Sequence, residues 1–178
     1  MSSNIVLRGI ATDSGIGSRP TSGIVIDDVP YGSALNTGAI PDLDPSDLQQ
    51  IEVLRGPQGT LYGASSMGGL IKYVMTDPDT SASFGRVEAG GSTAAHGGSG
   101  YNARTSVNLP FSDRFALRVS LFQRQDPDFI HNTNNDDRND SQVRGGRVSA
   151  LWNVTDTVTV RSSALFQDTE TGASSVVD

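Results

Sequence analysis

The second half of the chain alternates apolar and polar side chains with a period of two residues. Between positions 101 and 109 the odd residues are Tyr, Ala, Thr, Val and Leu, whereas the even residues are Asn, Arg, Ser and Asn. Alternation with this period predicts a β-strand that has one apolar and one polar face. The same pattern recurs between turns and predicts further strands over 83–90, 115–124, 147–154 and 158–167.

Two architectures produce such strands. A soluble antiparallel sheet that packs on a core gives the same alternation as the wall of a transmembrane β-barrel. Three features favour the barrel: strands close to the length of about 9–11 residues that crosses a bilayer, connections that alternate between short and long, and aromatic residues near strand ends. The short connections are 110–113 and 153–156, and the long ones are 91–100 and 126–142. The aromatic residues are Phe84, Tyr101, Phe111, Phe115, Trp152 and Phe166.

The arginines of this half fall on the predicted polar face. They are Arg86, Arg104, Arg118, Arg124, Arg147 and Arg161. Because an arginine on a lipid-facing surface costs about 2–4 kcal/mol near the bilayer midplane, this face is expected to line a wet lumen. Residues 80–178 carry nine basic and eleven acidic side chains, whereas residues 1–79 carry four and nine, a net charge of −5. An acidic first half complements an arginine-lined wall and is expected to sit inside it.

The first eighty residues differ from the rest, because they combine short β-like runs with many turn-forming residues. A helix is expected over 44–50, with Asp44 as N-cap and Pro45 at the first helical position. Strands are expected over 4–10, 51–56 and 70–75, and in a run over 23–31 that Asp27, Asp28 and Pro30 bring to an end. Glycine-bounded tight segments follow at 59–63 and 65–69. This pattern predicts a small α+β domain.

Composition and motifs exclude several classes of protein. The 178 residues have a formal net charge of −7, which disfavours a nucleic-acid binder, and they include no cysteine for a disulfide or thiol chemistry. No run approaches the roughly 20 apolar residues of a transmembrane helix. Gly15 and Gly17 begin like a dinucleotide fingerprint, but Pro20 replaces the third glycine. The segment 63–65 resembles a nucleophile elbow, but Met67 stands where glycine is required, so the glycines are interpreted as turn residues.

Other polar residues suggest sites that have simpler explanations. The acidic loop with Asp136, Asp137 and Asp140 offers oxygen ligands for Ca²⁺, but it lacks the EF-hand order and is interpreted as a solvated loop. The histidines at 96 and 131 have no second ligand at a suitable spacing and are interpreted as surface residues. Adjacent strand residues point to opposite faces, so Asp27 and Asp28 are not expected to share a proton. No nucleophile or acid–base set is present, and we expect neither an enzyme nor a cofactor.

One run of residues resembles a known family. The sequence IEVLRGPQGTLYG at 51–63, followed by GGLI at 68–71 and TDP at 76–78, is similar to the plug signature of TonB-dependent outer-membrane receptors. The segments that precede it in the family are matched at 7–9, 19–20 and 23–31. The resemblance covers about residues 5–79, and the strands after them fit the start of the family's barrel.

The resemblance implies an α+β plug domain over residues 1–79 and the N-terminal strands of an antiparallel transmembrane β-barrel over 80–178, part of a plugged barrel of about 22 strands. It implies location in the cell outer membrane and import of a scarce nutrient, foremost a ferric siderophore. Uptake would depend on plug rearrangement coupled to the inner-membrane partner TonB. Arg55 and Gly56 match the plug–barrel locking core, where Arg55 pairs with barrel carboxylates or stabilises a turn. The outward plug loops would bind ligand through Ser14, Arg19, Tyr31, Ser33, Asn36 and Tyr62.

The chain also departs from the family pattern. We expect an internal piece of a receptor, because no charged and apolar leader resembling a signal peptide opens the chain and no TonB-contacting box is recognised. About five barrel strands would leave two open edges, which cannot face lipid, so the piece alone is not expected to insert or transport. The alternative hypothesis is a free-standing soluble β-rich binding or adhesion module.

Overall fold

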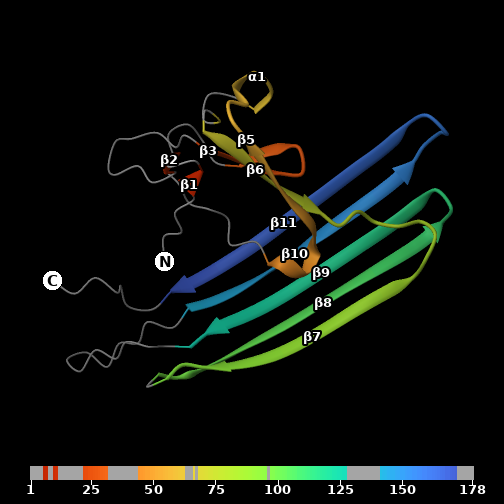
Figure 1. Ribbon diagram of the computed structural model, residues 1–178. Coiled ribbons are helices and arrows are strands. Elements are labelled where there is room, and N and C mark those ends of the chain that lie inside the picture. Colours follow the sequence, from red (N-terminus) through yellow and green to blue (C-terminus); the bar gives the residue numbers. More distant parts are fainter. Residues whose placement is uncertain are drawn as a thin grey trace. The chain divides into compact units, whose positions relative to one another are not determined.

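The computed structural model describes residues 6–7, 10–11, 22–31, 44–62, 66, 68–95, 97–127 and 141–171. The chain divides into two compact units, Met1–Thr76 and Asp77–Asp178, which are described separately as unit 1 and unit 2 (Figure 1). No helix among these residues is both long and apolar enough to cross a membrane.

Unit 1 contains a four-stranded mixed sheet in the order β4-β3-β6-β5. Strands β3 and β6 are parallel, and the other neighbours are antiparallel. A separate hairpin pairs β1 with β2, so the single strand expected over 4–10 is wrong. The elements of unit 1 are β1 (Val6–Leu7), β2 (Ile10–Ala11), β3 (Ser22–Ile26), β4 (Val29–Tyr31), the 3₁₀-helix η1 (Pro45–Asp47), β5 (Leu48–Arg55), α1 (Gly59–Tyr62) and β6 (Gly69–Met75).

The core of this sheet forms where β3 and β6 run side by side. Val25 and Leu70 are fully buried there. A Cβ atom on Gly23 would lie 2.6 Å from Oγ of Ser66 and 2.8 Å from Cδ1 of Leu70. Because real Cβ atoms do not approach other atoms so closely, Gly23 allows the segment at Ser66 to pack directly on β3.

Three further expectations for unit 1 need correction. Residues 48–50 are not helical, because Leu48 pairs with Met75 and the helix is limited to the single 3₁₀ turn Pro45–Asp47. The run over 23–31 does not end at its two aspartates. Asp27 adopts a positive φ of 54°, which reverses the chain into the edge strand β4. Pro30 is tolerated in β4 because an edge strand leaves one side of its backbone unpaired. The segment 59–63, expected only as tight, contains α1.

Unit 2 is a five-stranded antiparallel sheet in which each strand pairs with the next along the chain (Figure 1). The strands are β7 (Phe84–Thr93), β8 (Ser99–Ser112), β9 (Phe115–Asp126), β10 (Ser141–Asn153) and β11 (Thr159–Thr171). They are longer than the alternation predicts. The long connection expected over 91–100 is wrong, because its flanks belong to β7 and β8. Pro110 lies inside β8, next to a register shift, and not in the turn.

Candidate functional site

Two of the six predicted ligand residues lie in the described part of unit 1. Tyr31 ends β4, and Tyr62 ends α1. Tyr31 pairs with Ile24 of β3. Two residues earlier in β3, Ser22 pairs with Gly69, the first residue of β6. Since β5 ends at Arg55 opposite Gly69, both tyrosines belong to the same end of the sheet, here named the α1 end. Ser14, Arg19, Ser33 and Asn36 lie outside the described residues.

The loop at the α1 end is closed by its own backbone. The amide of Gln58 donates to the carbonyl of Ser66 (2.8 Å), and the amide of Tyr62 donates to the carbonyl of Gln58 (3.0 Å). Gly56 has a φ of +92°, although a Cβ there would meet no atom within 4 Å. Backbone conformation, and not lack of space, therefore requires glycine at this position. Tyr62 is half-buried and Tyr31 is exposed.

Arg55 is the last residue of β5, and its side chain is exposed in this chain. No carboxylate among the described residues of the chain pairs with it. The pairing with barrel carboxylates and the turn-stabilising role therefore both stay predictions.

Asp27 and Asp28 lie at the opposite end of the sheet, in the turn between β3 and β4. Asp27 donates its backbone amide to the carbonyl of Tyr73 and accepts from the amide of Met75 through Oδ1, both at 2.8 Å. Asp28 instead pairs with Lys72 at 2.8 Å, and this hydrogen bond raises the pKa of Lys72 against the opposing effect of burial. The two adjacent aspartates thus have separate partners. Asp44 and Asp47, which come just before β5, are also buried.

In unit 2 the strand register places all six predicted arginines on one face of the sheet. The row Asn108–Arg118–Ser149 shows how the polar residues of β8, β9 and β10 align. The central part of this polar face is buried: Asn108 has 0% exposure and Arg118 has 5%. Its other buried polar members are Ser106, Ser120, Arg147 and Ser149. Polar side chains at the centre of this face are thus buried, which is the reverse of a water-soluble sheet, whereas Arg86 and Arg161 on the outer strands are exposed.

The opposite face of unit 2 is apolar and exposed. Trp152 leaves 52% of its surface uncovered, and Val148, in the middle of β10, leaves 39%. Further exposed apolar residues of this face are Val87, Val107, Leu109, Leu121, Val160 and Phe166. An uncovered apolar surface that extends over five strands indicates contact with an apolar medium or partner.

Phe84 is an exception to the expected placement of aromatic residues. It pairs with Asn108, so its ring lies on the polar face and not in an outward girdle. The guanidinium carbon of Arg118 lies 5.7 Å from the ring centroid, within the range of a cation–π interaction. Alternation within β7 implies the same placement, because Phe84 lies two residues before Arg86, so the expectation of an outward girdle was wrong for this residue.

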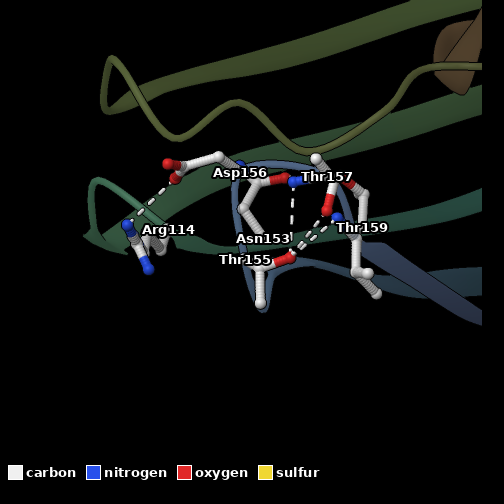
Figure 2. A network of polar contacts seen from close by, with 7 residues as sticks. Arg114, Asn153, Thr155, Asp156, Thr157 and Thr159 are labelled. Atoms are coloured by element: carbon white, nitrogen blue, oxygen red, sulfur yellow. Dashed lines mark hydrogen bonds and ion pairs between the residues drawn. The ribbon is translucent and has the colours of Figure 1, made fainter.

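The short connections are tied to each other at one end of the sheet (Figure 2). Arg114, in the turn between β8 and β9, forms an ion pair with Asp156 at 3.1 Å, and its carbonyl accepts from the amide of Asn153 at 2.8 Å. Within the β10–β11 turn, Oγ1 of Thr155 accepts from the amide of Val158 at 3.0 Å. Thr159 donates its hydroxyl to Oδ1 of Asn153 at 2.8 Å. These bonds confirm the predicted tight turn after Asn153.

At the other end of the sheet the apolar face becomes polar. Arg144 pairs with Asp168 at 2.7 Å and lies 3.6 Å from Glu170. In the same cross-strand row, Gln123 donates to the hydroxyl of Tyr101 at 2.9 Å. The apolar band on this face thus has a polar boundary toward the connection between β9 and β10.

No metal site is found in the described ranges, which contain no group of three His, Asp or Glu side chains able to hold an ion. The Ca²⁺ candidate with Asp136, Asp137 and Asp140, and the histidines at 96 and 131, lie outside those ranges.

Known proteins match residues of both units. The family model "TonB-dependent Receptor Plug Domain" matches residues 1–70. The pesticin receptor of Yersinia enterocolitica serotype O:8 is 34% identical over 149 residues, which cover 82% of this chain and 20% of that protein. The chain thus spans about a fifth of the length of the curated relatives it matches.

Solved structures share the fold at lower identity. A ferric enterobactin receptor mutant of Pseudomonas aeruginosa in complex with enterobactin aligns with a TM-score of 0.66 and 17% identity, covering 85% of this chain and 26% of that one. A copper transporter aligns with a TM-score of 0.62 and 18% identity, covering 85% of this chain and 24% of that one. At this level of identity the likeness concerns the fold.

Proposed function

Because this chain belongs to the TonB-dependent receptors of the outer membrane, which are transporters and not enzymes, we propose that it forms the plug and the first barrel strands of a nutrient importer. In this proposal residues 1–79 are the plug domain and residues 80–178 begin the barrel wall. The division of the chain near Thr76 supports these boundaries.

The observation that carries the proposal is the reversed polarity of the sheet of unit 2. Its apolar face is exposed, whereas the polar face is buried at its centre, around Asn108, Arg118 and Arg147. A wall between lipid and an aqueous, plug-filled lumen needs this arrangement. The row with Arg144, Asp168 and Glu170 would mark the polar boundary of the bilayer. A soluble module, the alternative hypothesis, would expose the apolar face to water at a large cost.

The proposed ligand is a ferric siderophore, bound at the α1 end of the plug sheet. Tyr31 and Tyr62 lie at that end, and the sequence places Ser14, Arg19, Ser33 and Asn36 in loops of the same domain. The enterobactin complex of the related structure supports this ligand class, and the related copper transporter defines the main competitor, a metal ion. Arg55 and Gly56 would lock the plug to barrel residues beyond this chain.

Release of the ligand would follow a plug rearrangement driven through TonB, with no covalent chemistry. The test is uptake of radioactive iron by iron-starved cells that lack the gene for this protein. Iron would be supplied either as ferric enterobactin or as the siderophore that the organism itself secretes. Uptake lost on deletion, restored by the gene and blocked when the proton-motive force is collapsed supports the proposal. Uptake that is unchanged by deletion contradicts the ligand class.

A further inference from the structure

The segment Asp77–Ala82, here named the strap, leads into β7 (Figure 1) and is fastened to the sheet of unit 2 by side-chain hydrogen bonds. On β8, Nδ2 of Asn108 donates to the carbonyl oxygens of Asp79 (2.8 Å) and Ala82 (2.7 Å). Oδ1 of Asn108 accepts from the amide of Asp79 (2.9 Å). One fully buried side chain thus makes three hydrogen bonds to the strap backbone, as a neighbouring strand would.

The strap has a second attachment and internal order. Oδ2 of Asp77 lies 3.3 Å from Nε of Arg161 on β11, which is separated from β8 by β9 and β10. Pro78, between the two attachments, is buried. Asp79 accepts from the hydroxyl (2.6 Å) and the amide (2.7 Å) of Ser81, and these hydrogen bonds hold the pKa of the Asp79 carboxyl below its usual value. The strap, with which unit 2 begins, is therefore an ordered crossing of the polar face of that sheet.

We propose that Asn108 is a positioning residue that makes the strap a fixed part of the barrel wall, so that plug rearrangement during uptake ends at Thr76. This inference rests on the proposed function. Displacing the strap would break three hydrogen bonds to one buried amide together, and such a group is costly to leave unpaired. Thr76, the last residue of unit 1, donates its amide instead to the carbonyl of Asp47 (2.8 Å). The strap would thus transmit no movement of the plug into β7.

Hydrogen exchange measured on the protein purified from its own outer membranes tests the attachment. In the parent protein the amides of Asp79 and Ser81 should exchange slowly, because both donate to side-chain acceptors. Asn108→Ala should speed exchange of the Asp79 amide by about tenfold or more. Asn102→Ala is the matched control, because Asn102 lies on the same face of β8 and should leave the strap unchanged. If the strap amides of the parent protein exchange as fast as those of an unstructured peptide, the proposal is wrong, and no variant is needed to show it.

A reversible cross-link tests whether the strap moves during uptake. The chain has no cysteine of its own, so Asp79→Cys combined with Asn108→Cys provides the only thiol pair within it. Oxidation joins the two sulfurs in a disulfide and passes two electrons to an added oxidant such as copper phenanthroline, and dithiothreitol reverses the step. We expect Asn108→Ala and the reduced double variant to lose uptake, because neither fastens the strap, and we expect the oxidised double variant to regain it.

Uptake that is abolished by oxidation and regained on reduction would mean that the strap must move, which overturns the proposal. The proposed ligand and the attachment of the strap are tested by different measurements. If the parent protein imports no iron chelate, the proposed ligand is wrong, but the exchange of the Asp79 amide still decides whether Asn108 fastens the strap.

Discussion

The carboxylate of Asp27 accepts a hydrogen bond of 2.8 Å from the backbone amide of Met75, 48 residues further along the chain. Asp27 has a positive φ of 54°, and its own amide donates to Tyr73. The β3–β4 turn is thereby pinned to the end of β6, where the chain leaves unit 1. A residue that the sequence presents as one of two acidic turn residues is thus a long-range connection.

Replacing Asp27 should loosen the end of β6. Asp27→Ala removes the acceptor of the Met75 amide, and we expect the free energy of local opening there to fall by about 1–3 kcal/mol. Site-resolved hydrogen exchange of Met75 measures this. Asp28→Ala is the neighbouring control, because Asp28 contacts Lys72 and not Met75. Equal exchange at Met75 in both variants would contradict the role of Asp27.

The Lys72–Asp28 pair should make unit 1 sensitive to high pH. The pKa of Lys72 is raised in the folded protein by its hydrogen bond to Asp28. A raised pKa contributes stability that is fully present below the unfolded value near 10.5 and is lost as pH rises through the folded value. Lys72 is the only lysine of the chain, so peptide-resolved acylation against pH reports its deprotonation. Asp28→Asn should shift this titration to lower pH, and an unchanged titration would exclude the pair as its cause.

Gly146 should resist substitution because two strands and an aromatic ring approach it closely. A Cβ atom would lie 2.6 Å from Cδ2 of Leu121, 2.6 Å from the carbonyl oxygen of Ser120 and 2.9 Å from Cζ of Phe166. We expect Gly146→Ala to destabilise the sheet by about 1–3 kcal/mol through overpacking. Gly91→Ala is the matched control, since its Cβ would meet only a carbonyl oxygen at 3.8 Å.

The measurement is the fraction of folded protein in the outer membrane, followed by the temperature at which it loses its compact form on a gel. A Gly146→Ala protein as heat-resistant as the Gly91→Ala protein would show that β9 or β11 can shift to accommodate the methyl group.

Local alternation was sufficient to predict the strands of unit 2 and the common face of its six arginines, because the side-chain period of a strand is fixed by its backbone. Applied to Phe84, the same period places its ring on the face of Arg86, as the pairing with Asn108 shows, but its position at a strand end led to the wrong expectation of an outward girdle. Alternation also predicted strands that are too short near 91–100. Glycine and serine have low β-propensity, although β7 and β8 include these residues.

In unit 1 the plug signature located the domain and the loop with Tyr62, but not the geometry around it. The turn at Asp27 and the strand at Leu48 depend on hydrogen bonds to β6, more than twenty residues away, which no local propensity contains. The attachment of Asn108 to the strap was missed for the same reason. In the sequence Asn108 is one of several polar residues on an alternating strand.

The central claim is that the exposed apolar face of unit 2 contacts lipid and the arginine face does not. Single fluorescent labels at Val148→Cys, on the apolar face, and Ser163→Cys, on the polar face of β11, test it in the full protein in outer-membrane vesicles. We predict that a quencher carried on lipid acyl chains dims the label at position 148 but not that at 163. Quenching of position 148 by a water-soluble quencher alone would contradict the account.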